Sequence, residues 1–252
     1  MIAYFLSDLH LGAPYFPDSR ESEKRVVDFL DKIKEDADVI YLLGDILDYW
    51  YEYKHVVPRG FVRFFGKLAE LSDMGIRIVW FIGNHDIWIF DYLPNELGVE
   101  VVDGYAIEEI DNVKFLLTHG DGIGKLKPSF KILRKLFRNR FCQFLFAGIH
   151  PRWTVPFANN WSRHSRKIEG PSEEDAKRMT DNVLTFSNDF VSEHPDIRYF
   201  IFGHLHIFER YQLPGEAEVV ILGEWISKNS YARWNGNELE LKIFHQENEV
   251  KK

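Results

Sequence analysis

Five short apolar runs, each ending in a cluster of polar residues, constrain the fold of this chain more than any other feature. The runs are rich in Val, Ile, Phe and Tyr without polar alternation, a pattern typical of strands buried on both faces. They cover residues 2–6, 39–43, 76–82, 113–117 and 197–202. Amphipathic segments over residues 22–35 and 60–72 separate the first three runs, which predicts parallel strands joined by helices in right-handed crossovers.

The C-terminal part of the chain adds a helix and three shorter strands. Residues 172–193 predict the helix, because a serine cap and acidic residues open the segment. The shorter runs cover residues 219–222, 230–234 and 239–244. Asn235-Gly236 lies between the last two and is a typical hairpin turn. We therefore expect an α/β fold with two packed sheets and helices outside them.

Composition limits the kind of protein. With 252 residues, of which 45% are apolar and 28% charged, the chain is expected to form one folded domain over residues 1–252. The single cysteine, Cys142, excludes a disulfide scaffold and a cysteine-based zinc cluster. No apolar run approaches the roughly 18–20 residues of a membrane-spanning helix, and Asp8 interrupts the first run too early for a signal peptide. We expect a cytoplasmic protein, with peripheral contact to a membrane left open.

The polar clusters carry the residues on which chemistry would depend. In chain order they are Asp8-Leu9-His10, Gly44-Asp45, Gly83-Asn84-His85-Asp86, His119-Gly120-Asp121 and Gly203-His204-Leu205-His206. Ligand sites in α/β sheets gather at the carboxyl ends of strands. Each cluster alone is compatible with an ordinary turn, but turns would also use Ser, Pro, Lys and Glu. Five such clusters after five apolar strands favour a metal site.

The donor types indicate which metals fit. Carboxylates, imidazoles and one amide oxygen suit Mn²⁺, Fe²⁺ or Zn²⁺ and do not suit copper or an iron–sulfur cluster. There are enough donors for two ions if one carboxylate bridges them. Two ions roughly 3.5–4 Å apart clamp an in-line displacement at phosphorus and make hydroxide available at neutral pH. The sequence therefore predicts a hydrolase with two divalent metal ions, and manganese is the metal we expect first.

In this order, the clusters resemble the motifs of the calcineurin-like metallophosphoesterase superfamily, and the match spans residues 7–206. The resemblance implies a four-layer αββα sandwich. It implies that one metal is held by Asp8, His10, Asp45 and His206. It implies that a second is held by Asp45, Asn84, His119 and His204, with Asp45 as the bridge. His85 would not be a ligand but would donate a proton or hydrogen bond to the phosphate or leaving oxygen, and Asp86 would orient it.

A basic and aromatic insertion covers residues 122–168. It contains eleven Lys or Arg and no Asp or Glu, although the formal net charge of the chain is −8. Residues 129–147 predict one amphipathic helix, and Trp153, Phe157 and Trp161 follow. The insertion is interpreted either as a helix packed on the body with solvated lysines, or as a lid for an acylated, phosphorylated ligand. It also suits an anionic membrane surface, whereas the acidic remainder argues against nucleic-acid binding.

Two segments narrow the resemblance. Residues 44–50 and 160–167 are similar to segments of bacterial UDP-2,3-diacylglucosamine pyrophosphohydrolases of the lipid A pathway. This implies a nucleotide-linked glycolipid substrate, cleaved to UMP and 2,3-diacylglucosamine 1-phosphate at the cytoplasmic face of the inner membrane, with acyl chains among the lid aromatics. The substrate contacts implied are Asn84, Asp121, Ser165, Arg166 and Lys167.

Two departures keep alternatives open. His85 stands where many members of that family have Arg, and Asp48 stands where Glu is usual. The alternatives are a metallophosphoesterase of the same superfamily acting on another nucleotide- or lipid-linked phosphodiester, a phosphoprotein phosphatase, and a non-catalytic binding module. The sequence does not predict the oligomeric state.

Overall fold

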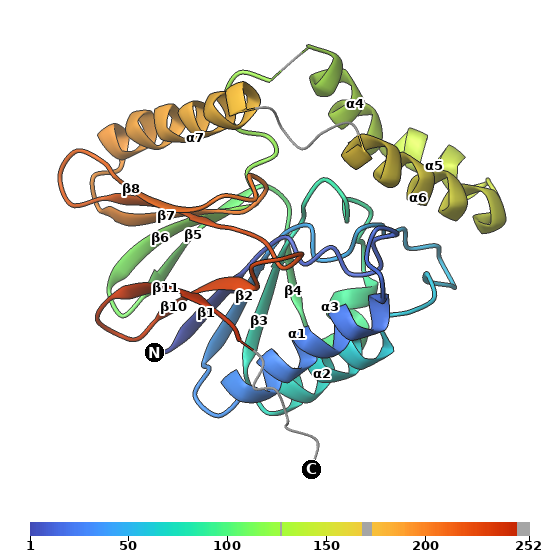
Figure 1. Ribbon diagram of the computed structural model, residues 1–252, viewed down its shortest axis with the longest axis horizontal. Helices are drawn as coiled ribbons and strands as arrows, with labels where there is room; N and C mark the ends of the chain where they lie inside the picture. Colours follow the sequence, from blue (N-terminus) through green and yellow to red (C-terminus); the bar gives the residue numbers. More distant parts are fainter. Residues whose placement is uncertain (127, 168–172, 246–252) are drawn as a thin grey trace.

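Two β-sheets pack face to face, and helices cover their outer faces (Figure 1). The computed structural model describes residues 1–126, 128–167 and 173–245. The four layers, helix–sheet–sheet–helix, are those that the motifs imply, so the predicted α/β sandwich is confirmed.

The first sheet has six strands in the order β11-β10-β1-β2-β3-β4. They are β1 (Ala3–Leu6), β2 (Val39–Leu43), β3 (Arg77–Phe81), β4 (Glu100–Val102), β10 (Ser230–Trp234) and β11 (Leu239–Ile243). The strands β1 to β4 run parallel, as predicted for the first three. β10 pairs antiparallel with β1 and with β11, which confirms the hairpin predicted at Asn235-Gly236.

The second sheet has five strands in the order β5-β6-β7-β9-β8. They are β5 (Tyr105–Ile110), β6 (Val113–Thr118), β7 (Ile197–Phe202), β8 (Phe208–Gln212) and β9 (Glu218–Leu222). β6, β7 and β9 run parallel, and β5 and β8 are antiparallel edge strands. A hydrogen bond joins the two sheets at their strand ends, because the His204 backbone N–H donates to Asp8 Oδ2 at 2.9 Å.

Aromatic side chains fill the space between the sheets. Phe5 stacks on Tyr41 with ring centroids 5.1 Å apart and on Phe115 at 5.8 Å. Phe115 also stacks on Tyr199 at 5.1 Å. All four residues are buried, so they contribute much of the apolar area that holds the two sheets together.

Helices complete the outer layers. The six-stranded sheet is covered by α1 (Ser19–Ile33), α2 (Val62–Asp73) and α3 (Tyr92–Leu97), and the five-stranded sheet by α7 (Glu173–Glu193). Asp18 caps α1, because its side chain accepts from the backbone N–H groups of Arg20 and Glu21. Among the described residues, no helix combines the length and apolar character needed to cross a bilayer.

The insertion differs from the single helix predicted over residues 129–147. It forms α4 (Pro128–Arg138), α5 (Arg140–Ala147) and α6 (Pro151–Lys167), which lie as a group beyond the strand ends (Figure 1). The prediction was wrong at Asn139, whose extended backbone ends α4 and whose side chain accepts from the Phe141 and Cys142 backbone N–H groups. Asparagine is among the best residues for starting a helix, so this local signal interrupted an amphipathic pattern that runs on through both helices.

Candidate active site

The loops after the strands turn sharply where the predicted metal ligands lie. Backbone φ is positive, between 45° and 66°, at five of them: Asp8, His10, Asp45, His204 and His206. Left-handed backbone is uncommon for residues other than glycine, and each instance costs of order 1–3 kcal/mol. Such conformations persist only where the surroundings fix them. Here they bring side chains from both sheets together.

Two motif glycines make this approach possible. A Cβ atom on Gly83 would collide with the backbone nitrogen and carboxylate of Asp45. A Cβ atom on Gly203 would collide with Ser7 Oγ and lie 2.9 Å from Asp8 Oδ2. The glycines therefore leave room for the two carboxylates that they face.

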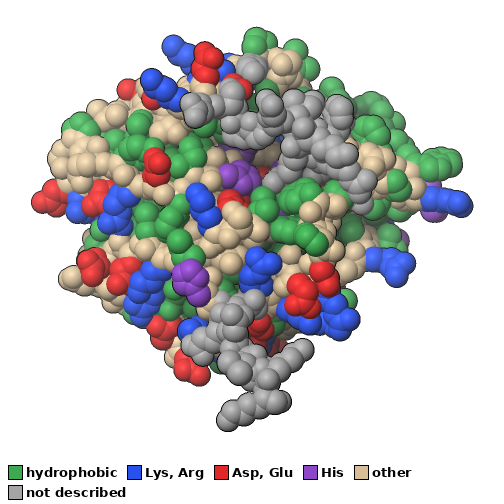
Figure 2. Space-filling model, viewed as in Figure 1, with side chains coloured by type: hydrophobic (Ala, Val, Ile, Leu, Met, Phe, Trp, Pro, Cys, Tyr) green, Lys and Arg blue, Asp and Glu red, His purple; other side chains and the backbone are tan. Residues whose placement is uncertain are grey.

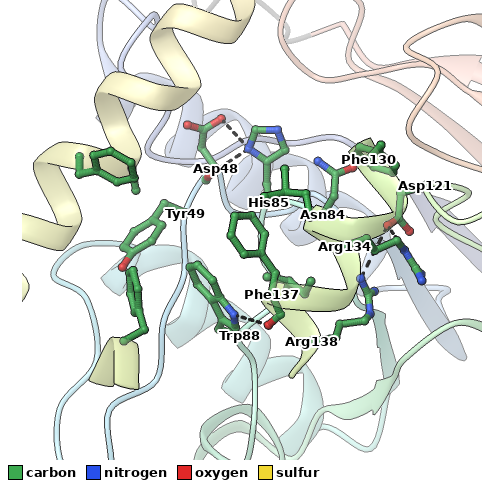
Figure 3. A pocket seen from close by; sticks show the side chains of 15 residues that line it. Asp48, Tyr49, Asn84, His85, Trp88, Asp121, Phe130, Arg134, Phe137 and Arg138 are labelled. Atoms are coloured by element: carbon green, nitrogen blue, oxygen red, sulfur yellow. Dashed lines mark hydrogen bonds and ion pairs between the residues drawn. The ribbon is translucent and has the colours of Figure 1, made fainter. Parts of the chain in front are cut away.

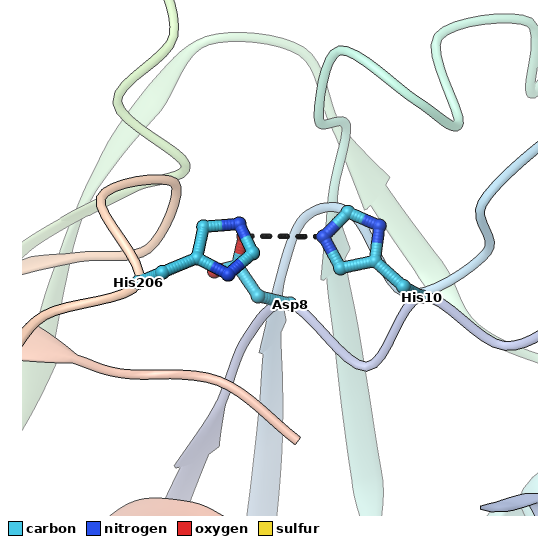
Figure 4. Close-up of side chains that lie close together, drawn as sticks. All are labelled: Asp8, His10 and His206. Carbon is cyan, nitrogen blue, oxygen red and sulfur yellow. Dashed lines mark ion pairs between the residues drawn. The ribbon is translucent and has the colours of Figure 1, made fainter. Parts of the chain in front are cut away.

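Asp8 lies between two histidines at one end of the site (Figure 4). Its Oδ1 atom is 3.3 Å from His206 Nε2 and 3.7 Å from His10 Nε2. The Asp8 side chain is fully buried, and Oδ1 has no hydrogen-bond partner in the part of the chain that the structure describes. Donor atoms of the three residues all lie within 4.8 Å of one another, so the group could hold one cation.

Asp45 joins this group to a second one. Its Oδ2 atom is 3.8 Å from His10 Nε2 and 3.4 Å from His119 Nε2. Donor atoms of Asp45, His119 and His204 also lie within 4.8 Å of one another. Asn84 Oδ1 is 3.3 Å from His119 Nε2. The structure thus brings all seven predicted ligands together, with Asp45 between the two groups.

The buried carboxylates need positive charge nearby. Burial favours the neutral acid, yet His119 and other histidines hold the pKa of Asp45 well below its ordinary value. Burial also disfavours a charged His119, but the carboxylates of Asp45 and Asp8 outweigh that effect and raise its pKa to about 10. The carboxylates therefore favour positive charge beside them, and the donors of the site are those that divalent manganese, iron or zinc accept. The residues fit two divalent ions.

His85 lies beside these residues but is held differently. Its backbone N–H donates to Asp45 Oδ1 at 2.8 Å, and its ring Nδ1 lies 3.0 Å from the Asp48 carbonyl oxygen. Because a carbonyl only accepts, Nδ1 carries the proton in this contact. The buried Asp48 carboxylate places Oδ1 3.6 Å from His85 Nδ1 and 3.3 Å from His10 Nδ1. Asp48 thus faces both imidazoles, a position that the sequence analysis did not assign to it.

Asp86 does not make the contact with His85 that we expected. Its fully buried carboxylate accepts from the backbone N–H groups of Gly83 at 2.8 Å and Ile46 at 2.9 Å. It therefore ties together the loops that follow β2 and β3, while Asp48 takes the place beside the His85 ring. A direct part for Asp86 in the reaction stays a prediction.

A cavity of about 470 Å³ opens beside Asn84 and His85 (Figure 3). The helices α4 to α6 supply much of its wall, with the apolar side chains of Phe130, Leu133, Phe137, Phe146 and Phe157. Pockets for small molecules are typically about 300–1,000 Å³ and mostly apolar, with a few polar groups that fix orientation. The cavity suits a ligand whose apolar part lies under the helices and whose polar end reaches the strand ends.

Polar contacts fasten these helices to the body. The Asp121 carboxylate accepts from Arg134 Nε at 2.9 Å, and the Trp88 indole donates to the Phe137 carbonyl at 2.9 Å. Asp121, predicted as a substrate contact, therefore pairs with α4 while it also lines the cavity.

Three other predicted substrate contacts occupy the last turn of α6. They are Ser165, Arg166 and Lys167, whose side chains lie outside the described part of the structure. Asn84 and Asp121 do line the cavity. Contact of the substrate with any of the five residues stays a prediction.

Comparison with known proteins places this site in a family. Residues 1–208 match the sequence profile described as "Calcineurin-like phosphoesterase". The chain belongs to this family. It is therefore a phosphoesterase, and the predicted superfamily and enzyme class are confirmed.

Among curated relatives, the chain is 41% identical to a protein named UDP-2,3-diacylglucosamine hydrolase from Porphyromonas gingivalis, over 94% of this chain and 95% of the relative. A protein of the same name from Hahella chejuensis is 27% identical over 96% of both chains. The likeness to a solved phosphoesterase from E. coli is weaker, with a TM-score of 0.46 and 14% sequence identity over 97% of both chains.

Replacing Asp48 by asparagine tests its place between the two imidazoles. We expect Asp48→Asn to lower both kcat for a phosphodiester and the affinity for Mn²⁺ by about 10–100-fold, the usual effect of losing a group that orients a ligand. When Asp48→Asn is added to the His85→Ala variant, it should lower kcat less than it does in the wild type, because the part that acts through His85 is already lost. It should still weaken Mn²⁺ binding. Steady-state kinetics and calorimetric Mn²⁺ titration measure the two effects.

Asp103→Asn is the matched control, because Asp103 is an exposed carboxylate that pairs with Arg138. It should change neither quantity. If Asp48→Asn behaves like this control, the assignment of Asp48 as a positioning residue is wrong.

Proposed function

We propose that this phosphoesterase hydrolyses the pyrophosphate bond of UDP-2,3-diacylglucosamine to UMP and 2,3-diacylglucosamine 1-phosphate. The observation that carries the proposal is the apolar cavity of about 470 Å³ beside His85 and Asn84. A diacylated sugar brings two acyl chains that need such a cavity, whereas a small soluble phosphoester does not. The names of the relatives from P. gingivalis and H. chejuensis support the same substrate.

The distances above support two groups of metal ligands. Asp8, His10, Asp45 and His206 would hold one metal ion, and Asp45, Asn84, His119 and His204 the other. Two bound divalent ions would supply positive charge to the phosphate oxygens and lower the pKa of water. Manganese is the metal we propose, and iron and zinc suit the same donors.

The other residues position the substrate. His85 lines the cavity, and its Nδ1 donates to the Asp48 carbonyl, so Nε2 is the ring atom that would meet the phosphate or the leaving oxygen. Water would add to the phosphorus next to uridine, and the bond from that phosphorus to the oxygen of the sugar phosphate would break. Because a sugar phosphate is a good leaving group, His85 needs to supply only a hydrogen bond to it.

We propose further that residues 122–168 form a lid inserted in a single domain. The Arg134–Asp121 pair and the Trp88–Phe137 hydrogen bond hold α4 over the strand ends. The polar substrates of a phosphoprotein phosphatase or a general phosphodiesterase have no acyl chain that would bind the apolar cavity wall formed by α4 to α6. The lid thus favours the acylated substrate over both alternatives.

Product analysis tests the reaction. Wild-type protein with Mn²⁺ should convert UDP-2,3-diacylglucosamine to UMP and a sugar 1-phosphate in phosphorus-31 spectra, and a chelator should stop the reaction. Leu133→Asn, which places a polar group in the cavity wall, should raise KM about tenfold or more. The same variant should leave turnover of bis(p-nitrophenyl) phosphate unchanged.

The neighbouring residue supplies the matched control. Ile132 lies on the same helix but is 67% exposed, so Ile132→Asn should have the kinetics of the wild type. Failure of the wild type to cleave the substrate while it hydrolyses the small diester would refute the proposed substrate. Equal effects of Leu133→Asn on both substrates would refute the role of the cavity.

We also propose that the outer face of the lid binds an anionic membrane surface. Six large apolar residues of this region are between 44% and 73% exposed: Leu136, Phe141, Phe144, Leu145, Ile149 and Trp153. Apolar and basic side chains lie together over these helices at the right of Figure 2. Exposed apolar patches with basic neighbours are typical of helices that lie in a bilayer interface.

Vesicle sedimentation tests this surface. The wild type should bind vesicles with anionic lipid more strongly than purely zwitterionic ones, and Phe144→Ser/Trp153→Ser should lose most of the binding. Val62→Ser is the control, because Val62 is 76% exposed on α2, outside the lid. Binding that the lid variant leaves intact would contradict the proposal.

A further inference from the structure

A second cavity, of about 300 Å³, adjoins the first at Phe130. Both cavities are lined by Phe130 and Asp121. The second also reaches His204, one of the proposed metal ligands. A single elongated ligand could therefore run from the first cavity, past the strand ends, into the second.

The wall of this second cavity differs from that of the first. Part of it is apolar, with Ile123, Met179, Val183 and Leu205. Its rim carries Lys125, Arg178, Asp175 and Asn182. An apolar floor with polar groups at the edge suits a planar heterocycle, whose faces are apolar and whose edge forms hydrogen bonds, and the two cations suit a phosphate.

Contacts within the rim hold these groups in place. The Asn182 side-chain oxygen accepts from the Lys125 backbone N–H at 3.3 Å, so α7 and the loop after β6 are joined at the rim. Arg178 pairs with Asp175 one turn earlier on α7. None of these four rim residues is a proposed metal ligand, and the reaction described above assigns no role to them.

We propose that this second cavity, the nucleotide cavity, binds the uridine monophosphate half of the substrate, with Lys125 and Arg178 donating hydrogen bonds to its phosphate and ribose oxygens. The inference rests on the proposed function, because it takes the nucleotide from that substrate. With the acyl chains in the first cavity, the nucleotide must leave the strand ends in another direction. The cavity at His204 provides that path.

A third cavity, of about 430 Å³, is the strongest rival. It is lined by Arg20, Arg59 and Arg63 and is therefore also cationic. It adjoins Leu11 and Tyr49 but is lined by none of the seven proposed metal ligands. A nucleotide bound there would hold its phosphate farther from the strand ends, so the nucleotide cavity is favoured.

Binding of UMP to the full-length protein with Mn²⁺, measured by calorimetry, tests the assignment. Lys125→Ala/Arg178→Ala should weaken UMP binding at least tenfold, because each change removes a cation that can pair with the ligand. Arg20→Ala/Arg59→Ala removes the same number of cations from the rival cavity and should leave the affinity unchanged. Loss of UMP binding in the second pair instead, or in neither, would overturn the proposal.

A variant that fills the cavity gives independent evidence. Met179→Trp should raise KM for the nucleotide-linked substrate and weaken UMP binding, because the larger side chain occupies the cavity. If the wild type cleaves UDP-2,3-diacylglucosamine but these variants do not affect UMP, the nucleotide cavity is wrong and the proposed function stands. If the wild type does not cleave that substrate but UMP binding is lost as expected, the proposed function fails and the nucleotide cavity stands.

Discussion

Two buried carboxylates, Asp8 and Asp45, are the constraint on which the rest of this structure depends. They follow adjacent parallel strands of one sheet, and both are almost fully excluded from solvent. A buried carboxylate costs several kcal/mol unless opposite charge and hydrogen bonds compensate it. The first sheet offers only part of that compensation, so most of it must come from elsewhere in the fold.

The second sheet supplies it. The loops after β6 and β7 bring in His119, His204 and His206, and the His204 backbone N–H donates directly to Asp8. The charge of the two carboxylates is therefore compensated only when the two sheets pack against each other. The close approach of the loops from the two sheets requires left-handed backbone at ligand residues. It also requires glycines opposite the carboxylates. Helix α4 then lies at the same edge, since Arg134 of α4 donates to the Asp121 carboxylate.

Much of this arrangement could be predicted from the sequence, because it depends on patterns. Predominantly apolar runs predicted the bounds of the buried strands β2 and β7 to the residue, and the polar clusters after them predicted the site. β5 was missed because its sequence, Tyr-Ala-Ile-Glu-Glu-Ile, has two acids in an edge strand that is largely exposed. α4 and α5 were predicted as one helix because the hydrophobic periodicity continues through both. The break comes from Asn139, which caps the start of α5.

It was harder to predict which side chains contact each other than to predict which residues lie in the site. Asp86 follows His85 directly in the chain and Asp48 precedes it by 37 residues, and neither spacing says which carboxylate faces the ring. The loop geometry determines the partners. The Asp86 carboxylate accepts from the backbone N–H groups of Gly83 and Ile46, and Asp48 faces the His85 ring. The exposure of the lid aromatics likewise depends on how α4 to α6 pack, which periodicity alone does not determine.

The central claim is that the strand ends form one two-metal centre bridged by Asp45. Electron paramagnetic resonance of the manganese-loaded protein, together with metal analysis, tests it most directly. The account predicts two Mn²⁺ per chain and the spectrum of an exchange-coupled pair, with the coupling lost in Asp45→Asn. One Mn²⁺ per chain, or two with an uncoupled spectrum in the wild type, would contradict it.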